Sequence, residues 1–255
     1  MNLRALAGWL RQTAAPAADS AACYVRSVSR THVGRVRTIN EDRVLDMSEH
    51  RLWAIADGMG GHAAGDAAAE AAIAMLQTVA LDGQVSADSL GAALSEVNRH
   101  LHERTRQGSP MSGATIVAMF EKNRAMTILW AGDCRAYRLR DGQLAQLTHD
   151  HTVVQELVDQ GALDAAQAAL HPQAHVVTRA LGAAEDLLLD RATSDALAGD
   201  LFLLCSDGLI SAPMALDRLI QSAPRLLPSR ADSLIAEALS CGGQDNISLL
   251  LVEII

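Results

Sequence analysis

The sequence predicts an α+β fold in which helices cover the outer faces of two largely antiparallel β-sheets. Three observations support this fold class: strand patterns occur in clusters, short polar turns separate the strands, and helical patterns fall in pairs between the clusters. A long helix after every strand would instead favour a parallel sheet. The chain has 255 residues, of which 49% are hydrophobic, so it can fill one large core. We expect one domain over residues 23–255.

The first part of the chain is predicted to be a flexible leader, residues 1–22. Its apolar stretch runs only from Leu6 to Leu10 and is closed by Arg11, whereas a secretory signal needs roughly 7 to 15 apolar residues. No apolar run reaches the roughly 18 to 20 residues of a membrane span. The four cysteines are widely spaced, which predicts buried free thiols in a reducing compartment; a disulfide or zinc site is the alternative. We expect a cytoplasmic protein.

The amino-terminal half combines strands with a pair of helices. Strand patterns occur at residues 24–36, 42–47 and 52–56. The last of these is apolar on both faces, as in a buried central strand. An alanine-rich helix is predicted over residues 63–80, and Ser86 is expected to cap a second helix that ends before Gly108.

The carboxy-terminal half is predicted to begin with an antiparallel meander of strands, after which helices and strands alternate. The meander strands are predicted at residues 115–120, 126–130, 135–140 and 143–147. Helices follow at residues 153–160 and after Asp164, which forms a capping-box pattern with Gln167. The remaining strands are expected at residues 187–190, 201–206 and 246–252, and the remaining helices around residues 214–221 and 230–240.

The charge balance disfavours nucleic acid as a partner. Lysine and arginine number 21 against 30 acidic residues, the formal net charge is −9, and no basic run is present. An acidic protein can still bind a phosphate group when bound cations supply the local positive charge.

Four acidic clusters lie where a predicted strand meets a loop: Glu41-Asp42, Asp57-Gly58, Asp207-Gly208 and Asp245-Asn246. Any single Asp-Gly pair is more often an ordinary turn. However, Asp57 and Asp207 each follow an almost wholly apolar strand, where an unpaired carboxylate is costly to bury. Hard cations such as Mg²⁺ and Mn²⁺ need oxygen ligands, so converging carboxylates would form such a site.

Five motifs in this order resemble those of the type 2C protein phosphatases, the Mg²⁺/Mn²⁺-dependent PPM family, with bacterial members looking closest. They are Arg37 to Asp42, Ala56 to His62, Ala131 to Arg135, Cys205 to Leu209 and Gly243 to Ser248. The resemblance covers roughly residues 24–254. It implies a four-layer αββα sandwich, a flap region at about residues 149–180, and a centre with two Mn²⁺ or Mg²⁺ ions.

The resemblance also implies a ligand set. Asp57 would bridge the two ions, and Asp207 and Asp245 would complete one of them. Glu41 and the backbone carbonyl of Gly58 would help to hold the other.

Two further acidic residues belong to the implied metal centre. Asp42 would lie behind the ligands, since it and Glu41 point to opposite faces of a strand. Asp133 matches the residue with which bacterial relatives hold a third, weaker ion together with the equivalent of Asp207; the alternative is a plain turn aspartate.

Two basic residues match catalytic positions of the family. Arg37 would grip the phosphate, which suits a planar guanidinium, although a surface arginine is the alternative. His62 would protonate the leaving alkoxide, with a structural histidine as the alternative. Cys134, Thr152 and Ser248 depart from common family residues, but none removes a proposed ligand.

The implied activity is hydrolysis of phosphoserine and phosphothreonine in proteins by water that the metals activate. We expect a monomer that acts on substrates of a bacterial-type serine/threonine kinase. A phosphoprotein-binding regulator of the same fold is one alternative, and a phosphatase for small phosphoesters is another. The retention of all four acidic clusters with Arg37 and His62 disfavours an inactive regulator.

Overall fold

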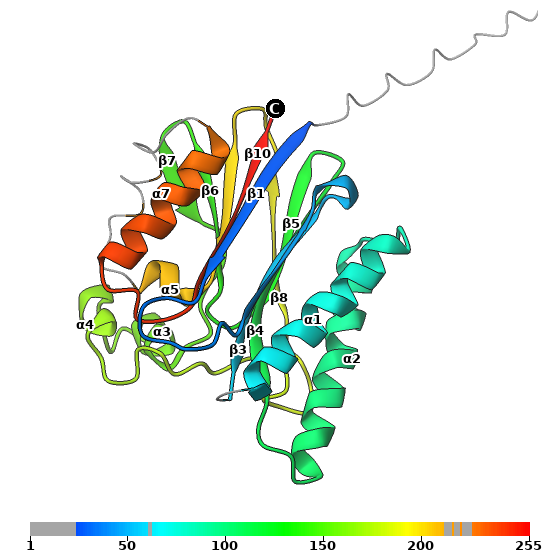
Figure 1. Cartoon of the computed structure of the whole chain (residues 1–255), viewed down its shortest axis with the longest axis vertical. Coiled ribbons are helices and arrows are strands. Elements are labelled where there is room, and N and C mark those ends of the chain that lie inside the picture. Colours follow the sequence, from blue (N-terminus) through cyan, green and yellow to red (C-terminus); the bar gives the residue numbers. More distant parts are fainter. Residues whose placement is uncertain (1–23, 61–62, 212–215, 217–219, 221–225) are drawn as a thin grey trace, which may run out of the picture.

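The computed structural model describes residues 24–60, 63–211, 216, 220 and 226–255. In these residues the strands form two five-stranded antiparallel sheets that stack face to face, with helices on both outer faces (Figure 1). The first sheet has the order β1 (Val25–His32), β10 (Ile247–Ile254), β9 (Leu201–Cys205), β6 (Arg135–Arg140) and β7 (Gln143–Gln146). The second has the order β2 (Asp42–Met47), β3 (Leu52–Met59), β4 (Gly113–Lys122), β5 (Ala125–Ala131) and β8 (Asp190–Asp195). The four-layer αββα sandwich expected from the sequence is confirmed.

The period-two alternation of strand side chains explains how one strand serves two cores. In β9, Phe202 and Leu204 pack between the sheets. Leu201 and Leu203 instead point outward and pack with α7 (Leu227–Ser240). Both faces of this strand are therefore buried, which is why its sequence is uniformly apolar.

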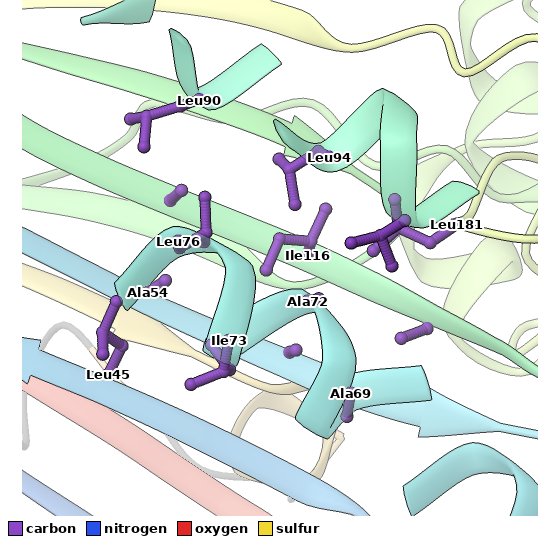
Figure 2. Packing of buried hydrophobic residues seen from close by; sticks show 14 of the residues in the cluster. Leu45, Ala54, Ala69, Ala72, Ile73, Leu76, Leu90, Leu94, Ile116 and Leu181 are labelled. Carbon is purple, nitrogen blue, oxygen red and sulfur yellow. The ribbon is translucent and has the colours of Figure 1, made fainter. Parts of the chain in front are cut away.

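The second sheet is covered by α1 (Ala63–Leu81) and α2 (Ala87–Arg106). Figure 2 shows Ile73, Leu76, Leu90 and Leu94 of these helices packed over Ile116 of β4. Ser86 caps α2 through a capping box with Ser89, as its position predicted. This helical layer ends close to the acidic residues at the end of β3.

Beside the same end of the sandwich lies the predicted flap region, residues 149–180. It contains α3 (Val153–Asp159), capped by Thr152, and α4 (Ala165–Ala169), which begins with the predicted Asp164–Gln167 capping box. An isolated bridge between Thr152 and Val177 closes the base of the segment. Figure 1 shows α3 and α4 below β6 and β7.

Some sequence predictions were wrong or lie outside the described residues. The strand expected at residues 187–190 is β8 at Asp190–Asp195, and Leu187 and Leu189 pack on the helical core instead. The first strand ends at His32 rather than at residue 36. A short helix, α5 (Asp207–Ile210), was not predicted. The leader at residues 1–22 and most of the helix expected at 214–221 lie outside the described residues.

Two smaller predictions were also tested. Cys134, Cys205 and Cys241 are free thiols, of which the first two are buried and the third is half-buried. No helix in the described part of the chain is long and apolar enough to cross a membrane.

Candidate metal centre

Asp57 lies near the end of β3 and faces the space between the sheets. Trp53 and Ile55 of the same strand pack there, and alternation places Asp57 on the same face. Its registered partner in β2 is Asp42, so two carboxylates lie side by side. Burial raises the pKa of Asp57 well above its usual value, and the charge of Asp42 raises it further. The fold thus holds an acidic group where its ionised form is costly.

Asp42 sits behind Asp57 and is 2% exposed. Ser206 Oγ donates a hydrogen bond of 2.8 Å to Asp42 Oδ2. Oδ1 is buried and accepts no hydrogen bond among the described residues. Burial is the main cause that raises the pKa of Asp42 to about 7. This oxygen lacks the polar partner that buried carboxylates normally have.

Gly58 must be glycine because the first turn of α1 approaches it closely. A Cβ atom at Gly58 would lie 2.4 Å from the carbonyl oxygen of Gly65. The backbone NH of Gly58 donates to the carbonyl of Glu41 over 3.2 Å. These contacts bring Glu41, Gly58 and the start of α1 together.

Asp207 and Asp245 come from the neighbouring ends of β9 and β10. A Cβ atom at Gly208 would lie 1.9 Å from the carbonyl oxygen of Asn246, which shows how tightly the two turns pack. Burial raises the pKa of Asp207, and the charge of Asp245 adds to the shift. Besides burial, the charge of Asp207 in turn raises the pKa of Asp57, so the two carboxyl groups lie near each other.

Asn246 is a positioning residue that sequence reasoning did not single out, although it lies inside a recognised motif. Its Nδ2 donates 2.9 Å hydrogen bonds to the carbonyls of Val33 and Ile39, and its Oδ1 accepts from the NH of Glu41 over 2.8 Å. One side chain therefore joins the start of β10 to the loop that carries Arg37.

Arg37 reaches over the acidic centre. Its Nη2 donates to Asp245 Oδ2 over 2.7 Å, and its side chain is 53% exposed. The ion pair orients the guanidinium, while the exposed part remains accessible to a substrate.

Asp133 approaches from the turn between β5 and β6. Burial, followed by the charge of Asp207, raises the pKa of Asp133 to about 7. The preceding residue, Gly132, is held by His151 of the flap: the Gly132 NH donates to His151 Nδ1 over 3.1 Å, and the His151 NH donates to the Gly132 carbonyl over 3.0 Å. His151 also stacks on Trp130, with 6.2 Å between ring centroids.

These residues surround one pocket of about 630 Å³. Seven residues predicted from the sequence line it, namely Arg37, Glu41, Asp57, Gly58, Asp133, Asp207 and Asp245. Asp42 is not among the lining residues, in agreement with its buried place behind Asp57. His62 lies outside the described residues. The pocket also contains His175 of the flap, which no sequence motif indicated.

The donor set fits divalent cations. All five acidic side chains in the pocket offer the oxygen ligands that Mg²⁺ and Mn²⁺ prefer. Besides burial, the charge of Asp207 raises the pKa of Asp57, and a bound cation would offset the repulsion between the two ionised carboxyl groups. In the described residues no three His, Cys, Asp or Glu side chains are placed close enough together to hold one metal ion. Water would complete the coordination, because Mg²⁺ in particular retains several waters.

Comparisons with known proteins agree with this arrangement. Residues 30–250 match the family described as Protein phosphatase 2C. The chain is 36% identical over 236 residues to serine/threonine phosphatase stp of Listeria monocytogenes, covering 88% of this chain and 94% of that protein. The structure is similar to that of PppA, described as a key regulatory component of T6SS in Pseudomonas aeruginosa, with 39% identity and a TM-score of 0.80. That match covers 91% of this chain and 98% of the other. It is also similar to the catalytic domain of the serine threonine protein phosphatase PstP in complex with two manganese ions, with 33% identity, a TM-score of 0.80, and coverage of 91% and 98%.

Proposed function

Since the chain belongs to the protein phosphatase 2C family, we propose that its pocket residues bind the cations and the phosphate with which it hydrolyses phosphoserine and phosphothreonine in proteins. The chain is a metal-dependent serine/threonine protein phosphatase, and Mn²⁺ or Mg²⁺ is its cofactor. The residue roles below are our proposal for this chain.

The observation that carries the proposal is the crowding of acidic groups at one end of the sandwich. Burial and mutual repulsion raise the pKa of Asp57, Asp133 and Asp207 together. A fold gains no stability from such an arrangement unless cations compensate the charge. The centre therefore has the properties of a binding site rather than of a structural ion-pair network.

The ligand roles are those that the family implies for these pocket residues. We assign Asp57 to bridge two cations, with Asp207 and Asp245 on one side and Glu41 with the Gly58 carbonyl on the other. Asp42 lies behind Asp57, and its charge acts on that residue. When bound, the two cations supply an activated water and offset the negative charge of the phosphoryl group.

Asp133 and Asp207 would share a third, weaker ion. The charge of Asp207 is the strongest charge effect on the pKa of Asp133, so the two groups lie near each other. His151 holds the backbone before Asp133 and thereby fixes its direction.

Two basic residues act on the substrate. Arg37 binds phosphate oxygens through the exposed part of its guanidinium, while its bond to Asp245 keeps it oriented. His62 donates a proton to the leaving oxygen of serine or threonine; this role rests on its motif, since the residue lies outside the described part of the chain.

The setting of the enzyme is also proposed. We propose that residues 23–255 form the phosphatase domain and that residues 149–180 form its flap; residues 1–22 lie outside the described residues. We further propose a cytoplasmic monomer whose substrates are phosphorylated by a bacterial-type serine/threonine kinase. Light scattering after size-exclusion chromatography tests the monomer, and a stable dimer at micromolar concentration would contradict it.

The activity is tested by metal-titrated turnover of phosphoserine and phosphothreonine peptides. Hydrolysis should require added Mn²⁺ or Mg²⁺ and stop in excess EDTA, because the activated water exists only with the cations bound. Full turnover in excess EDTA would contradict the mechanism. Small phosphorylated metabolites, assayed in parallel, should be poorer substrates than the peptides.

A further inference from the structure

The loop that carries Arg37 also presents two exposed apolar side chains. Val36, directly before Arg37, is 59% exposed, and Ile39, two positions after it, is 44% exposed. A single apolar side chain at a surface needs no explanation. These two, however, flank the residue to which we assign phosphate binding. We call Val36 and Ile39 the apolar rim.

The loop under the apolar rim is fixed to the start of β10. The NH of Arg35 donates to the Gly243 carbonyl over 2.7 Å, and the carbonyl of Ile39 accepts a 2.9 Å hydrogen bond from Asn246 Nδ2. Figure 1 shows this loop, in dark blue after β1, beside the red segment that leads into β10. The apolar rim is therefore exposed although its backbone is held in place.

The apolar rim lies within reach of a substrate whose phosphate is bound by Arg37. Arg37 lines the pocket, and its ion pair with Asp245 directs the guanidinium toward the acidic centre. Because consecutive Cα atoms are about 3.8 Å apart, the Cα atoms of Val36 and Ile39 lie within roughly 8 Å of that of Arg37. An extended peptide has the same spacing. The residues one or two positions from the phosphorylated one therefore come close to the rim.

Both rim side chains are suited to an apolar contact. Valine and isoleucine are β-branched, so χ1 is stiff and little rotamer freedom is lost when a ligand covers them. Covering exposed apolar surface removes it from water, which favours binding. Building on the proposed function, we infer that the apolar rim binds a large apolar side chain next to the phosphoserine or phosphothreonine of the substrate. The substrate class is thus phosphoprotein segments with apolar flanking residues.

The contact should appear in KM rather than in kcat. A flanking side chain does not react, so it contacts the rim equally in the bound substrate and in the transition state. Full burial of a valine or isoleucine side chain strengthens binding greatly, but the rim is open and a peptide covers only part of it. We therefore expect a difference in KM of about fivefold.

The test compares two phosphothreonine peptides that carry either leucine or asparagine on both sides of the phosphothreonine. Leucine and asparagine are similar in size and uncharged, so the formal net charge of −9 on the protein acts equally on both peptides. With the Mn²⁺-loaded full chain, KM should be about fivefold lower for the leucine peptide. The difference should disappear in the double variant Val36→Ser, Ile39→Ser.

The matched control is Leu81→Ser, which also removes an exposed apolar side chain. Leu81 is 63% exposed and is the last residue of α1, a helix of 19 residues whose first turn contacts Gly58 of the pocket. The helix therefore places Leu81 roughly 27 Å from its own start. This variant should keep the preference for the leucine peptide. The KM for p-nitrophenyl phosphate, which has no flanking residues, should be the same in all three proteins.

Several outcomes would overturn the inference: no leucine preference in the wild type, a preference that survives in the double variant, or a raised KM for p-nitrophenyl phosphate in that variant. Light scattering tests a second copy of the chain as the occupant, and a wild-type dimer that dissociates in the double variant would assign the rim to that contact instead. If neither peptide is hydrolysed with Mn²⁺, the proposed function fails as well, so the two failures are distinguishable.

Discussion

Single residues in the pocket are held in states that they would not adopt in water. Burial and the charges of neighbouring carboxylates raise the pKa of both Asp57 and Asp207, because ionised carboxylates repel each other. This arrangement persists because β-strand packing fixes the backbone beneath each carboxyl group. We therefore expect removal of a single carboxylate charge from the pocket to have a clear effect on catalysis.

Replacement of Asp57 by asparagine should abolish turnover while the fold is retained. The change removes an anionic ligand at nearly constant volume, and a loss of at least about 100-fold in kcat is expected. Peptide hydrolysis at saturating Mn²⁺ measures it, and circular dichroism checks the fold. Asp186→Asn, at an exposed loop carboxylate, is the control. A near-normal rate in Asp57→Asn would show that the ligand assignment is wrong.

Replacement of Arg37 by alanine should raise KM by about tenfold or more, because the guanidinium contacts substrate oxygens. Mn²⁺ affinity should change little, as arginine is not a ligand. Arg35→Ala is the matched control: Arg35 is an exposed arginine of the same loop whose backbone NH bonds to Gly243. Equal kinetics for the two variants would assign Arg37 a surface role only.

Replacement of His62 by glutamine should affect poor leaving groups most. A serine alkoxide needs a proton donor, and general acid catalysis contributes about 10² to 10⁴-fold. The phenolate of p-nitrophenyl phosphate leaves without that help, so its hydrolysis should fall only several-fold. Steady-state rates on both substrates at saturating Mn²⁺ provide the comparison. Equal losses would mean that His62 orients water or supports its loop instead.

Most residues of the candidate site could be predicted from the sequence, whereas the places of His175 and Asn246 could not. Seven of the predicted residues line one pocket because each motif lies at a strand end, and the strand ends meet. His175 was missed because it follows no recognised pattern and reaches the pocket only through the path of the flap. Asn246 was visible in its motif, but its three hydrogen bonds depend on tertiary contacts with residues more than 200 positions away.

At the scale of elements, the buried strand β3 and the exposed edge strand β7 were predicted well, whereas the exposed edge strand β8 was misplaced. Strand β3 is apolar on both faces, so its pattern is unambiguous. Strand β8 is an edge strand with the sequence DRATSD, which has no apolar alternation to detect. The neighbouring Leu187 and Leu189 are apolar because they pack against the helical core. Their apolar character led to the wrong prediction of a strand at residues 187–190. The helix α5 has only four residues, too few to show a helical periodicity in the sequence, so it was not predicted.

The junction between β9, α5 and β10 should be intolerant of added volume. Gly208→Ala places a methyl group where the carbonyl of Asn246 lies, so the turns that carry Asp207 and Asp245 must separate. We expect a loss of at least about 2 kcal/mol in the free energy of unfolding and weaker Mn²⁺ binding. Urea denaturation and Mn²⁺ titration measure the two effects.

A glycine-to-alanine change elsewhere provides the control for this junction. Gly91 lies in the interior of α2, and a Cβ atom there would make only ordinary contact with Leu189 at 3.9 Å. Gly91→Ala should stabilise the protein by about 0.5 to 1 kcal/mol, because alanine has the higher helix propensity. If Gly208→Ala and Gly91→Ala were equally stable, the close contact of Gly208 with Asn246 would not limit the residue volume at position 208.

At the scale of the whole molecule, the proposed metal centre would join the two sheets. Asp57 comes from the second sheet, whereas Asp207 and Asp245 lie at the ends of strands in the first. Without cations, repulsion among these groups acts across the sandwich. With cations bound as proposed, the same groups would hold both sheets together at one end. Metal binding should thus contribute to global stability as well as to catalysis.

The last prediction concerns how this contribution depends on pH. Burial raises the pKa values of Asp42 and Asp133 to about 7 in the folded, metal-free protein, while the unfolded chain has values near 3.9. The folded state therefore binds more protons, so the stability from these groups is fully present below about pH 4 and is lost as pH rises through about 7. The melting temperature of the EDTA-treated protein should fall by at least about 2 °C between pH 6 and pH 8.

Calorimetry at the two pH values, with EDTA or with saturating Mn²⁺, measures this effect. The increase in melting temperature on adding Mn²⁺ should be larger at pH 8, because the cation binds the deprotonated carboxylates and competes with protons at pH 6. Metal-free Asp57→Asn should lose less stability between pH 6 and pH 8 than the wild type, since one charge that repels Asp42 is gone. An equal Mn²⁺-dependent increase at both pH values would mean that the pocket carboxylates are already ionised at pH 6, which would contradict their raised pKa values.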